Sequence, residues 1–176
     1  VLEGVQNVAA LLRLDDSRWV VCGRLLDGHG FAALYSPMQW ELTPLNVPQT
    51  RAFVGGSSNV ERELALVVGS NGVALRIERD QCSVSVVQGT PDLSAGAVDL
   101  LDREWAASLS TLWTRDSRSG QTFMPAWKDD AFQAPFVSLM ADAGLIRAMS
   151  ADGGIVEGRN AVAPIRPPQP SRDHRR

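Results

Sequence analysis

Few residues of this chain belong to the types that perform acid–base or nucleophilic chemistry, and they are scattered. His29, in the turn Asp27-Gly28-His29-Gly30, is the only histidine away from the C-terminal end. A histidine titrates near neutral pH and can act as a general base, but it then needs a serine or cysteine nucleophile beside it. The sequence pairs no such residue with His29. We therefore interpret His29 as a solvated turn residue, and we predict no catalytic residue.

Metal and phosphate chemistry are not indicated either. The two cysteines, Cys22 and Cys82, cannot form a four-thiolate zinc site, and each lies in or beside an apolar run, which favours packed, reduced thiols over a disulfide. The acid pairs Asp15-Asp16 and Asp129-Asp130 fit solvated turn carboxylates better than calcium ligands. No H-E-x-x-H, phosphate-loop or G-x-S-x-G motif is present. We expect no metal and no cofactor.

The glycine- and serine-rich segment Phe53-Val54-Gly55-Gly56-Ser57-Ser58-Asn59 resembles a phosphate loop only in composition. It lacks the lysine that reaches the phosphates in such loops. We interpret it as the end of a strand followed by a loop.

The elements that position these residues follow a repeat. A tight turn between short apolar strands recurs around Gly30, Gly72 and Gly153, with a weaker copy around Thr111. The spacings between these positions are 42, 39 and 42 residues. Repeating units of about 40 to 45 residues with several short strands are typical of β-propeller blades. We predict an all-β fold: a β-propeller or partial propeller of about four four-stranded antiparallel blades.

The four blades are expected within residues 1–165, at about 7–48, 49–91, 92–131 and 132–165. The segment from Val98 to Leu109 comes closest to a helix, and helix is the alternative there. We favour strand, because Trp105 stands where the first unit has Trp19. The strands are expected at residues 8–14, 18–25, 31–35, 40–45, 51–55, 63–68, 73–78, 83–88, 97–101, 104–108, 112–116, 122–127, 135–140, 144–149, 155–159 and 161–165.

Size and composition fit one domain with a packed core, since 176 residues are 44% apolar. No run approaches the roughly 18 apolar residues of a membrane span, and residues 1–14 do not resemble a secretion signal. We expect no membrane span. The chain begins at Val1 rather than Met, so an upstream segment could carry a targeting signal. The compartment is unknown, and only the lack of a visible signal favours the cytoplasm.

Charge is unevenly spread over a net value of −3. Residues 1–158 carry 19 acidic and 12 basic residues, so we expect no nucleic-acid binding by the body of the chain. Residues 166–176 are rich in proline and arginine and have nothing apolar to bury, which predicts a disordered tail. A linker or terminus is the simplest interpretation of it. A proline-rich ligand or a basic arm is the alternative.

Two segments resemble propellers of the BNR or Asp-box type, which occur in sialidases and in photosystem assembly factors. The hairpin from Val68 to Leu75 resembles the second-to-third strand hairpin of such blades. The segment from Thr114 to Phe123 resembles an Asp box with two extra residues and Phe in place of Trp. The box is a turn brace, in which the carboxylate accepts backbone N–H groups and the aromatic ring packs below. The other units keep only fragments of the motif.

The resemblance implies an assembly or scaffolding role rather than sialidase chemistry. Sialidases use an arginine cluster and a Tyr–Glu pair at the central funnel. The only tyrosine here, Tyr35, falls in a third strand, and no glutamate occupies a matching position.

The inner hairpin turns of a propeller share one face with the connections between blades, and ligands usually meet that face. His29, Asn71, Ser110 and Asp152 would lie there and are the predicted binding residues. The five tryptophans are expected mainly between blades, although copies left open at loops would favour glycan binding.

Four blades are enough for a small closed ring or for about half of a larger one. A half-ring leaves two apolar sheet faces bare, which something must cover. We expect a protein partner or a second copy to complete the ring, with self-closure as the alternative. The predicted function is a non-catalytic module for protein recognition or assembly within a larger protein or complex. The alternatives are a glycan-binding or sensory domain of a larger enzyme and a hydrolase acting at the propeller funnel.

Overall fold

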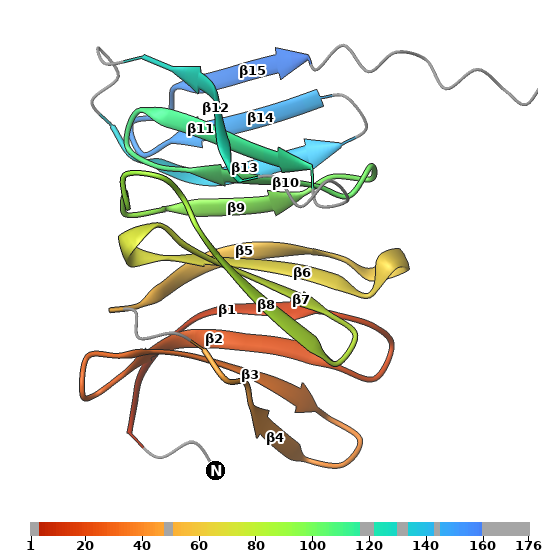
Figure 1. The fold of residues 1–176 in the computed structure, drawn as a ribbon. Helices are drawn as coiled ribbons and strands as arrows, with labels where there is room; N and C mark the ends of the chain where they lie inside the picture. Colours follow the sequence, from red (N-terminus) through yellow and green to blue (C-terminus); the bar gives the residue numbers. More distant parts are fainter. Residues whose placement is uncertain (1–3, 48–50, 117–121, 130–133, 143–144, 160–176) are drawn as a thin grey trace, which may run out of the picture.

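The computed structural model describes residues 4–47, 51–116, 122–129, 134–142 and 145–159. Within these ranges the chain is all-β and forms four antiparallel sheets that follow one another like a stack (Figure 1). Sheets 1 to 3 have four strands each and sheet 4 has three. The strands are β1 Val5–Arg13, β2 Trp19–Leu25, β3 Gly30–Ser36 and β4 Glu41–Pro44 in sheet 1; β5 Phe53–Asn59, β6 Leu64–Gly69, β7 Val73–Glu78 and β8 Gln81–Val86 in sheet 2; β9 Ala95–Val98, β10 Arg103–Ala107, β11 Thr111–Asp116 and β12 Met124–Lys128 in sheet 3; and β13 Phe136–Asp142, β14 Leu145–Ser150 and β15 Ile155–Arg159 in sheet 4.

Each sheet is a meander of strands that are consecutive in the sequence. The first strands of neighbouring sheets, β1, β5, β9 and β13, contact one another in that order. This is the blade arrangement that the repeat predicts, and it confirms the fold class. Among the described residues, no helix is both long and apolar enough to cross a membrane. The expected strand at 161–165, the tail at 166–176 and the centre of the Asp-box segment at 117–121 lie outside the described residues.

The interpretation of the glycine-rich segment as a strand end and loop is wrong, because β5 runs through it from Phe53 to Asn59. Its glycines are needed where strands approach closely. A Cβ added at Gly56 would lie 2.0 Å from the backbone oxygen of Leu66 on the neighbouring strand β6. Only a residue without a Cβ fits there, so the composition reflects packing and not phosphate binding.

The segment from Val98 to Leu109 is strand and turn, not helix. Trp105 and Trp19 are nonetheless not equivalent. Trp105 is buried against sheet 4, whereas Trp19 pairs with Tyr35 on the face of sheet 1 that is turned away from sheet 2. Side chains alternate between the two faces of a strand, so a slip of one residue in the alignment of two repeats exchanges the faces.

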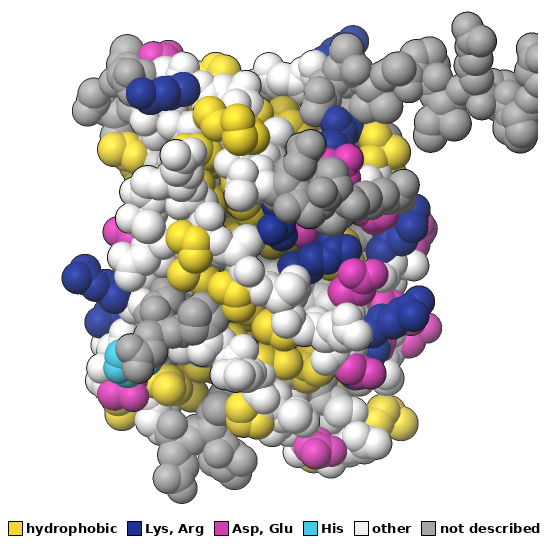
Figure 2. Space-filling model, viewed as in Figure 1, with side chains coloured by type: hydrophobic (Ala, Val, Ile, Leu, Met, Phe, Trp, Pro, Cys, Tyr) yellow, Lys and Arg dark blue, Asp and Glu magenta, His cyan; other side chains and the backbone are white. Residues whose placement is uncertain are grey.

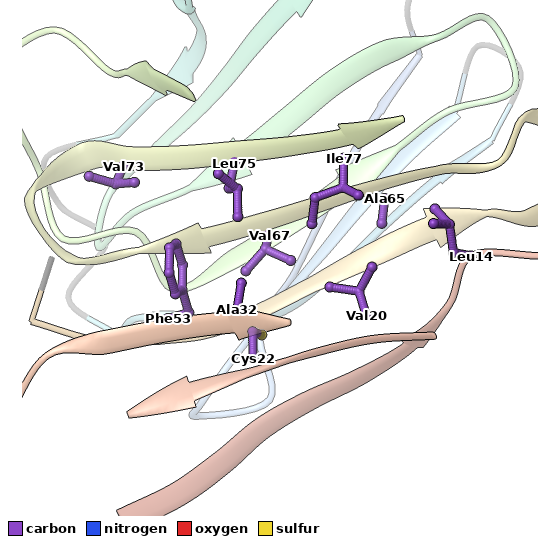
Figure 3. Close-up of a cluster of buried hydrophobic side chains, with 10 residues drawn as sticks. All are labelled: Leu14, Val20, Cys22, Ala32, Phe53, Ala65, Val67, Val73, Leu75 and Ile77. Atoms are coloured by element: carbon purple, nitrogen blue, oxygen red, sulfur yellow. The ribbon is translucent and has the colours of Figure 1, made fainter. Parts of the chain in front are cut away.

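Three buried apolar clusters join consecutive sheets. The first lies between sheets 1 and 2, where Val20 and Cys22 of β2 face Phe53 and Val67 of sheet 2 (Figure 3). The second cluster lies between sheets 2 and 3 and the third between sheets 3 and 4. None of the three joins sheet 4 to sheet 1. The sheets therefore form an open arc in the part of the chain that the structure describes.

Cys22 lies in the buried cluster between sheets 1 and 2, and we call each such contact between neighbouring sheets a seam. This burial predicts a low reactivity of the Cys22 thiol. Both cysteines are free, Cys22 is buried, and burial raises the pKa of its thiol to about 12. Because the thiolate is the reactive form, Cys22 should resist a disulfide exchange reagent at pH 8 in the native protein and react within minutes in 6 M urea. A Cys82→Ser variant isolates this signal. Fast native labelling of that variant would show that the seam between sheets 1 and 2 opens readily.

Candidate recognition face

The predicted binding residues lie at the inner hairpin turns of the four sheets. His29 ends the β2–β3 turn, Asn71 lies in the β6–β7 turn, Ser110 in the β10–β11 turn and Asp152 in the β14–β15 turn. These turns share one end of the molecule, at the left in Figure 1. We call this end the tip face.

The β8–β9 connection, which the structure describes in full, lies on the tip face as well. Asn71 takes a left-handed conformation with φ of 59°, and its N–H donates to Asp92 Oδ1 at 2.9 Å in the β8–β9 connection. In sheet 3, the N–H of Asp129 donates to the backbone oxygen of Ser110 at 3.0 Å. Hydrogen bonds therefore hold these turns against neighbouring segments, which gives the tip face a defined shape.

A backbone hydrogen bond that recurs in three of the sheets shows which turn residues occupy equivalent positions. In sheet 2 the N–H of Ser70 donates to Ala52 just before the first strand, at 3.1 Å. Leu26 and Ala151 make the same bond in sheets 1 and 4, to Gly4 and Pro135. The next residue along the chain is Asn71 in sheet 2, Asp152 in sheet 4 and Asp27 in sheet 1. Asp27 rather than His29 is thus the counterpart of Asn71.

The acidic turn residues already have hydrogen-bond partners. Asp152 Oδ1 accepts hydrogen bonds from the hydroxyl of Ser150 and from the N–H of Gly154, and these bonds lower the pKa of its carboxyl. Asp27 Oδ1 accepts the N–H of His29 at 2.9 Å. Both side chains shape their own turns. They present fixed negative charge at the tip face.

The opposite end of the molecule carries aspartates that brace turns, and sequence reasoning missed this role. Asp99 Oδ1 accepts the N–H groups of Leu101 and Arg103, and its Oδ2 accepts Arg103 Nε at 2.9 Å. Asp15 does the same for Ser17 and Arg18 between β1 and β2. An aspartate followed by an arginine three or four residues later is the sequence signal. The turn that Asp99 braces follows directly after β9, so β9 ends at Val98 and not at Leu101 as predicted.

The Asp15 brace predicts a pH effect. Burial raises the pKa of Asp15, but the Ser17 N–H and the Arg18 guanidinium outweigh burial, so the net pKa is lowered. The brace thus stabilises the fold above the pKa of Asp15 in the unfolded chain, and this stability is lost as pH falls through the folded value. In urea unfolding between pH 7 and pH 2.5, Asp15→Asn should be less stable than wild type at pH 7. The difference in free energy of unfolding between the two proteins should narrow at pH 2.5. An unchanged difference would contradict a charge-dependent brace.

A buried ion cluster joins sheets 2 and 3. Glu104 of β10 is fully buried, and its Oε1 accepts Arg76 Nη1 of β7 at 2.8 Å. Its Oε2 accepts Arg115 Nε of β11 at 3.0 Å, and Arg115 also lies over the ring of Phe123. Burial lowers the pKa of Arg76, but the hydrogen bonds and opposite charges of Glu104 and Glu78 together outweigh burial, so the net pKa is raised. Both oxygens of Glu104 accept hydrogen bonds from arginine, so the cluster holds sheets 2 and 3 together.

In the view of Figure 2, basic and acidic side chains gather at the end opposite the tip face. A hollow of about 310 Å³ there is lined by Arg62, Arg76 and Arg79 and by Glu61, Glu63, Glu78 and Asp102. Its three arginines stand among four carboxylates, so the hollow has no strong preference for anions or for cations. Within the described residues, no group of three His, Cys, Asp or Glu side chains could hold a metal ion.

Three tryptophans pack between sheets, and one, Trp40, is largely exposed to solvent. Trp105 is buried, and Trp113 and Trp127 pack against the second and third clusters. Trp40 is 85% exposed in the β3–β4 turn, which contradicts a packing role for it. An apolar cavity of about 210 Å³ lies between sheets 3 and 4, with Trp105, Trp127 and Val156 among its lining residues and Glu157 and Arg159 beside them.

The comparisons with known proteins support the fold alone. No family model matches the chain, and no curated protein sequence matches it. The crystal structure of the computationally designed Ika4 protein is similar with a TM-score of 0.66 and 15% sequence identity, over 90% of this chain and 95% of that one. The computationally designed Ika8 protein gives the same TM-score and identity over 90% of this chain and 48% of that one. This chain thus spans about half the length of Ika8. Four antiparallel sheets in sequence order and these two similarities identify an all-β protein of propeller architecture with four blades.

Proposed function

We propose that this chain is a non-catalytic β-propeller module that recognises or assembles other proteins, as part of a larger protein or complex. The relation to BNR or Asp-box propellers belongs to this proposal, since it rests on the sequence segments alone. The observation that carries the proposal is that both end sheets of the arc expose apolar side chains. Leu11 of sheet 1 is 54% exposed, and Met140 and Ile155 of sheet 4 are 66% and 69% exposed. Apolar faces of this kind are typical of protein interfaces.

The tip face supports a recognition role. Its turns are held by hydrogen bonds to neighbouring segments, and a surface that is ordered before binding loses less entropy when a partner docks. Asp27 and Asp152 supply fixed negative charge and Asn71 supplies an amide. This chemistry favours a protein surface with hydrogen-bond donors or basic side chains.

Site-specific photocrosslinking in the source cells tests this proposal. A photoreactive amino acid is placed at Asn71, Ser110 or Asp152, and its protein adducts are identified by mass spectrometry. The matched control is Glu61, an exposed position at the opposite end of the molecule. We expect the same partner protein at two or more tip positions and not at position 61. Adducts equally frequent at both ends, or none at the tips, would contradict recognition by the tip face.

Trp40 favours a second candidate, glycan binding, because exposed tryptophan rings stack on sugars. It lies at the end of the molecule opposite the tip face, since β3 leads away from the β2–β3 turn. A glycan array with wild type and Trp40→Ala distinguishes the two functions. Binding that is lost in Trp40→Ala would establish the glycan-binding alternative. Hydrolysis of fluorogenic ester or glycoside substrates by the purified chain would instead support the hydrolase.

A further inference from the structure

Among the residues that the structure describes, the arc has two uncovered sheet faces, and they differ from each other. Four sheets have eight faces, and the three buried clusters cover six of them. The remaining two are the face of sheet 1 turned away from sheet 2 and the face of sheet 4 turned away from sheet 3. We call them the first end face and the last end face.

The first end face is built like an interior face. Cross-strand pairing places Leu11 and Val21 in one row, and Trp19, Tyr35 and Leu42 in another, with Arg13 at the edge of the second row opposite Trp19. Val21 stands five residues before Leu26, just as Ala65 and Ile146 stand five residues before Ser70 and Ala151, the residues that make the same backbone bond. Ala65 and Ile146 are both buried against the preceding sheet. The sequence thus supplies the first end face with side chains suited to burial by another sheet.

The last end face is apolar with one ion pair in its centre. Met140, Met149 and Ile155 are exposed there, by 66%, 45% and 69%. Between them Arg147 Nε lies 2.8 Å from Glu157 Oε2. Arg147 occupies the position of the buried Leu66, four residues before the equivalent turn residue. A seam can hold such charges when they are paired, because Arg76 and Glu104 already do so between sheets 2 and 3.

We propose that a second copy of this chain covers both end faces. The last end face of each copy packs on the first end face of the other, and the two arcs close into a ring of eight blades. This inference rests on the proposed assembly function and names the partner. Two unlike faces make a head-to-tail contact, which either closes at a fixed copy number or grows without limit. The chain covers 48% of an Ika8 chain of the same fold, so two copies supply the blades that one Ika8 chain contains.

The first test is the mass of the purified 176-residue chain, measured by light scattering over a range of concentrations. We expect twice the chain mass of 19.0 kDa. Leu11→Lys should give the mass of one copy, because the charge falls in both seams of the ring. Met140→Glu should do the same from the other side of each seam. Val84→Lys is the matched control, since Val84 is 44% exposed on β8 and not on an end face.

Mixing the two variants separates this model from other dimers. A pair of one Leu11→Lys copy and one Met140→Glu copy has one unaltered seam and one seam that joins Lys to Glu. We expect the mixture to regain the mass of two copies. A variant that changes the mass must keep the wild-type circular dichroism, so that loss of folding is not mistaken for dissociation.

Three outcomes would overturn the proposal. They are a folded single copy at 100 µM, a mixture that stays dissociated, and a wild-type mass that grows steadily with concentration. A single copy that still crosslinks to a partner through Asn71 would overturn the ring while leaving the proposed function intact. A ring of two copies without crosslinks at the tip face would support the ring and overturn recognition by the tip face.

Discussion

Replacing Glu104 with alanine should destabilise the fold by about 3–5 kcal/mol, because the change leaves two partly buried guanidinium groups without their carboxylate. Arg76 and Arg115 are each 15% exposed and come from different sheets, so their repulsion would act directly on the seam between sheets 2 and 3. The measurement is the free energy of unfolding from urea titration followed by tryptophan fluorescence. The unfolding midpoint should fall well below that of wild type.

Asp16→Ala is the matched control for this prediction. Asp16 pairs with Arg13 on the surface and is 93% exposed, so its loss should cost less than about 1 kcal/mol. A triple variant with Arg76→Met, Glu104→Leu and Arg115→Met should recover most of the stability lost in Glu104→Ala, since apolar groups of similar size replace buried ion clusters well. A loss for Glu104→Ala no larger than that for Asp16→Ala would contradict the assignment.

Gly56→Ala should destabilise the protein by roughly 1–3 kcal/mol or more, because the new methyl group meets backbone and not a movable side chain. Its Cβ would lie 2.0 Å from Leu66 O, and 3.0 Å from the carbonyl carbon of Leu66 and from Val67 Cα. Strands β5 and β6 would have to separate, and their ladder would weaken. Thermal unfolding and amide hydrogen exchange of β6 would report this change.

The neighbouring residue provides the control for Gly56→Ala. A Cβ at Gly55 meets nothing within 4 Å, so Gly55→Ala should be neutral or stabilise the fold by up to about 0.5–1 kcal/mol through the unfolded chain. Equal destabilisation by both substitutions would indicate a general effect of glycine loss in β5. It would contradict the specific contact with strand β6.

The order of the strands could be predicted from the sequence because each turn is marked locally. The Gly72 and Gly153 turns both have positive φ, and this requirement is visible in the residue type. The true extent of β5 could not be predicted, because it depends on how closely β6 approaches Gly56. That approach is a contact between strands and leaves no periodic signal in either one.

The candidate site, too, could be predicted from the sequence only in part. Sequence reasoning placed Asn71, Ser110 and Asp152 in the inner hairpin turns, where the structure finds them, because turn position follows from strand order. It did not identify Glu104, since nothing near that residue in the sequence announces that Arg76, 28 residues earlier, lies opposite. Nor did it distinguish Asp27 from His29, because that equivalence depends on a backbone bond from Leu26 to Gly4.

The strictly sequential make-up of the sheets bears on how the protein is made. Since each sheet in the described part of the chain consists of consecutive strands, it can complete its ladder as soon as its last described strand leaves the ribosome, and none of these strands must wait for a distant partner. During synthesis the newest sheet presents a bare apolar face until the next one is translated. A pause in translation at the end of a sheet would therefore prolong exposure of that face and favour aggregation of the nascent chain.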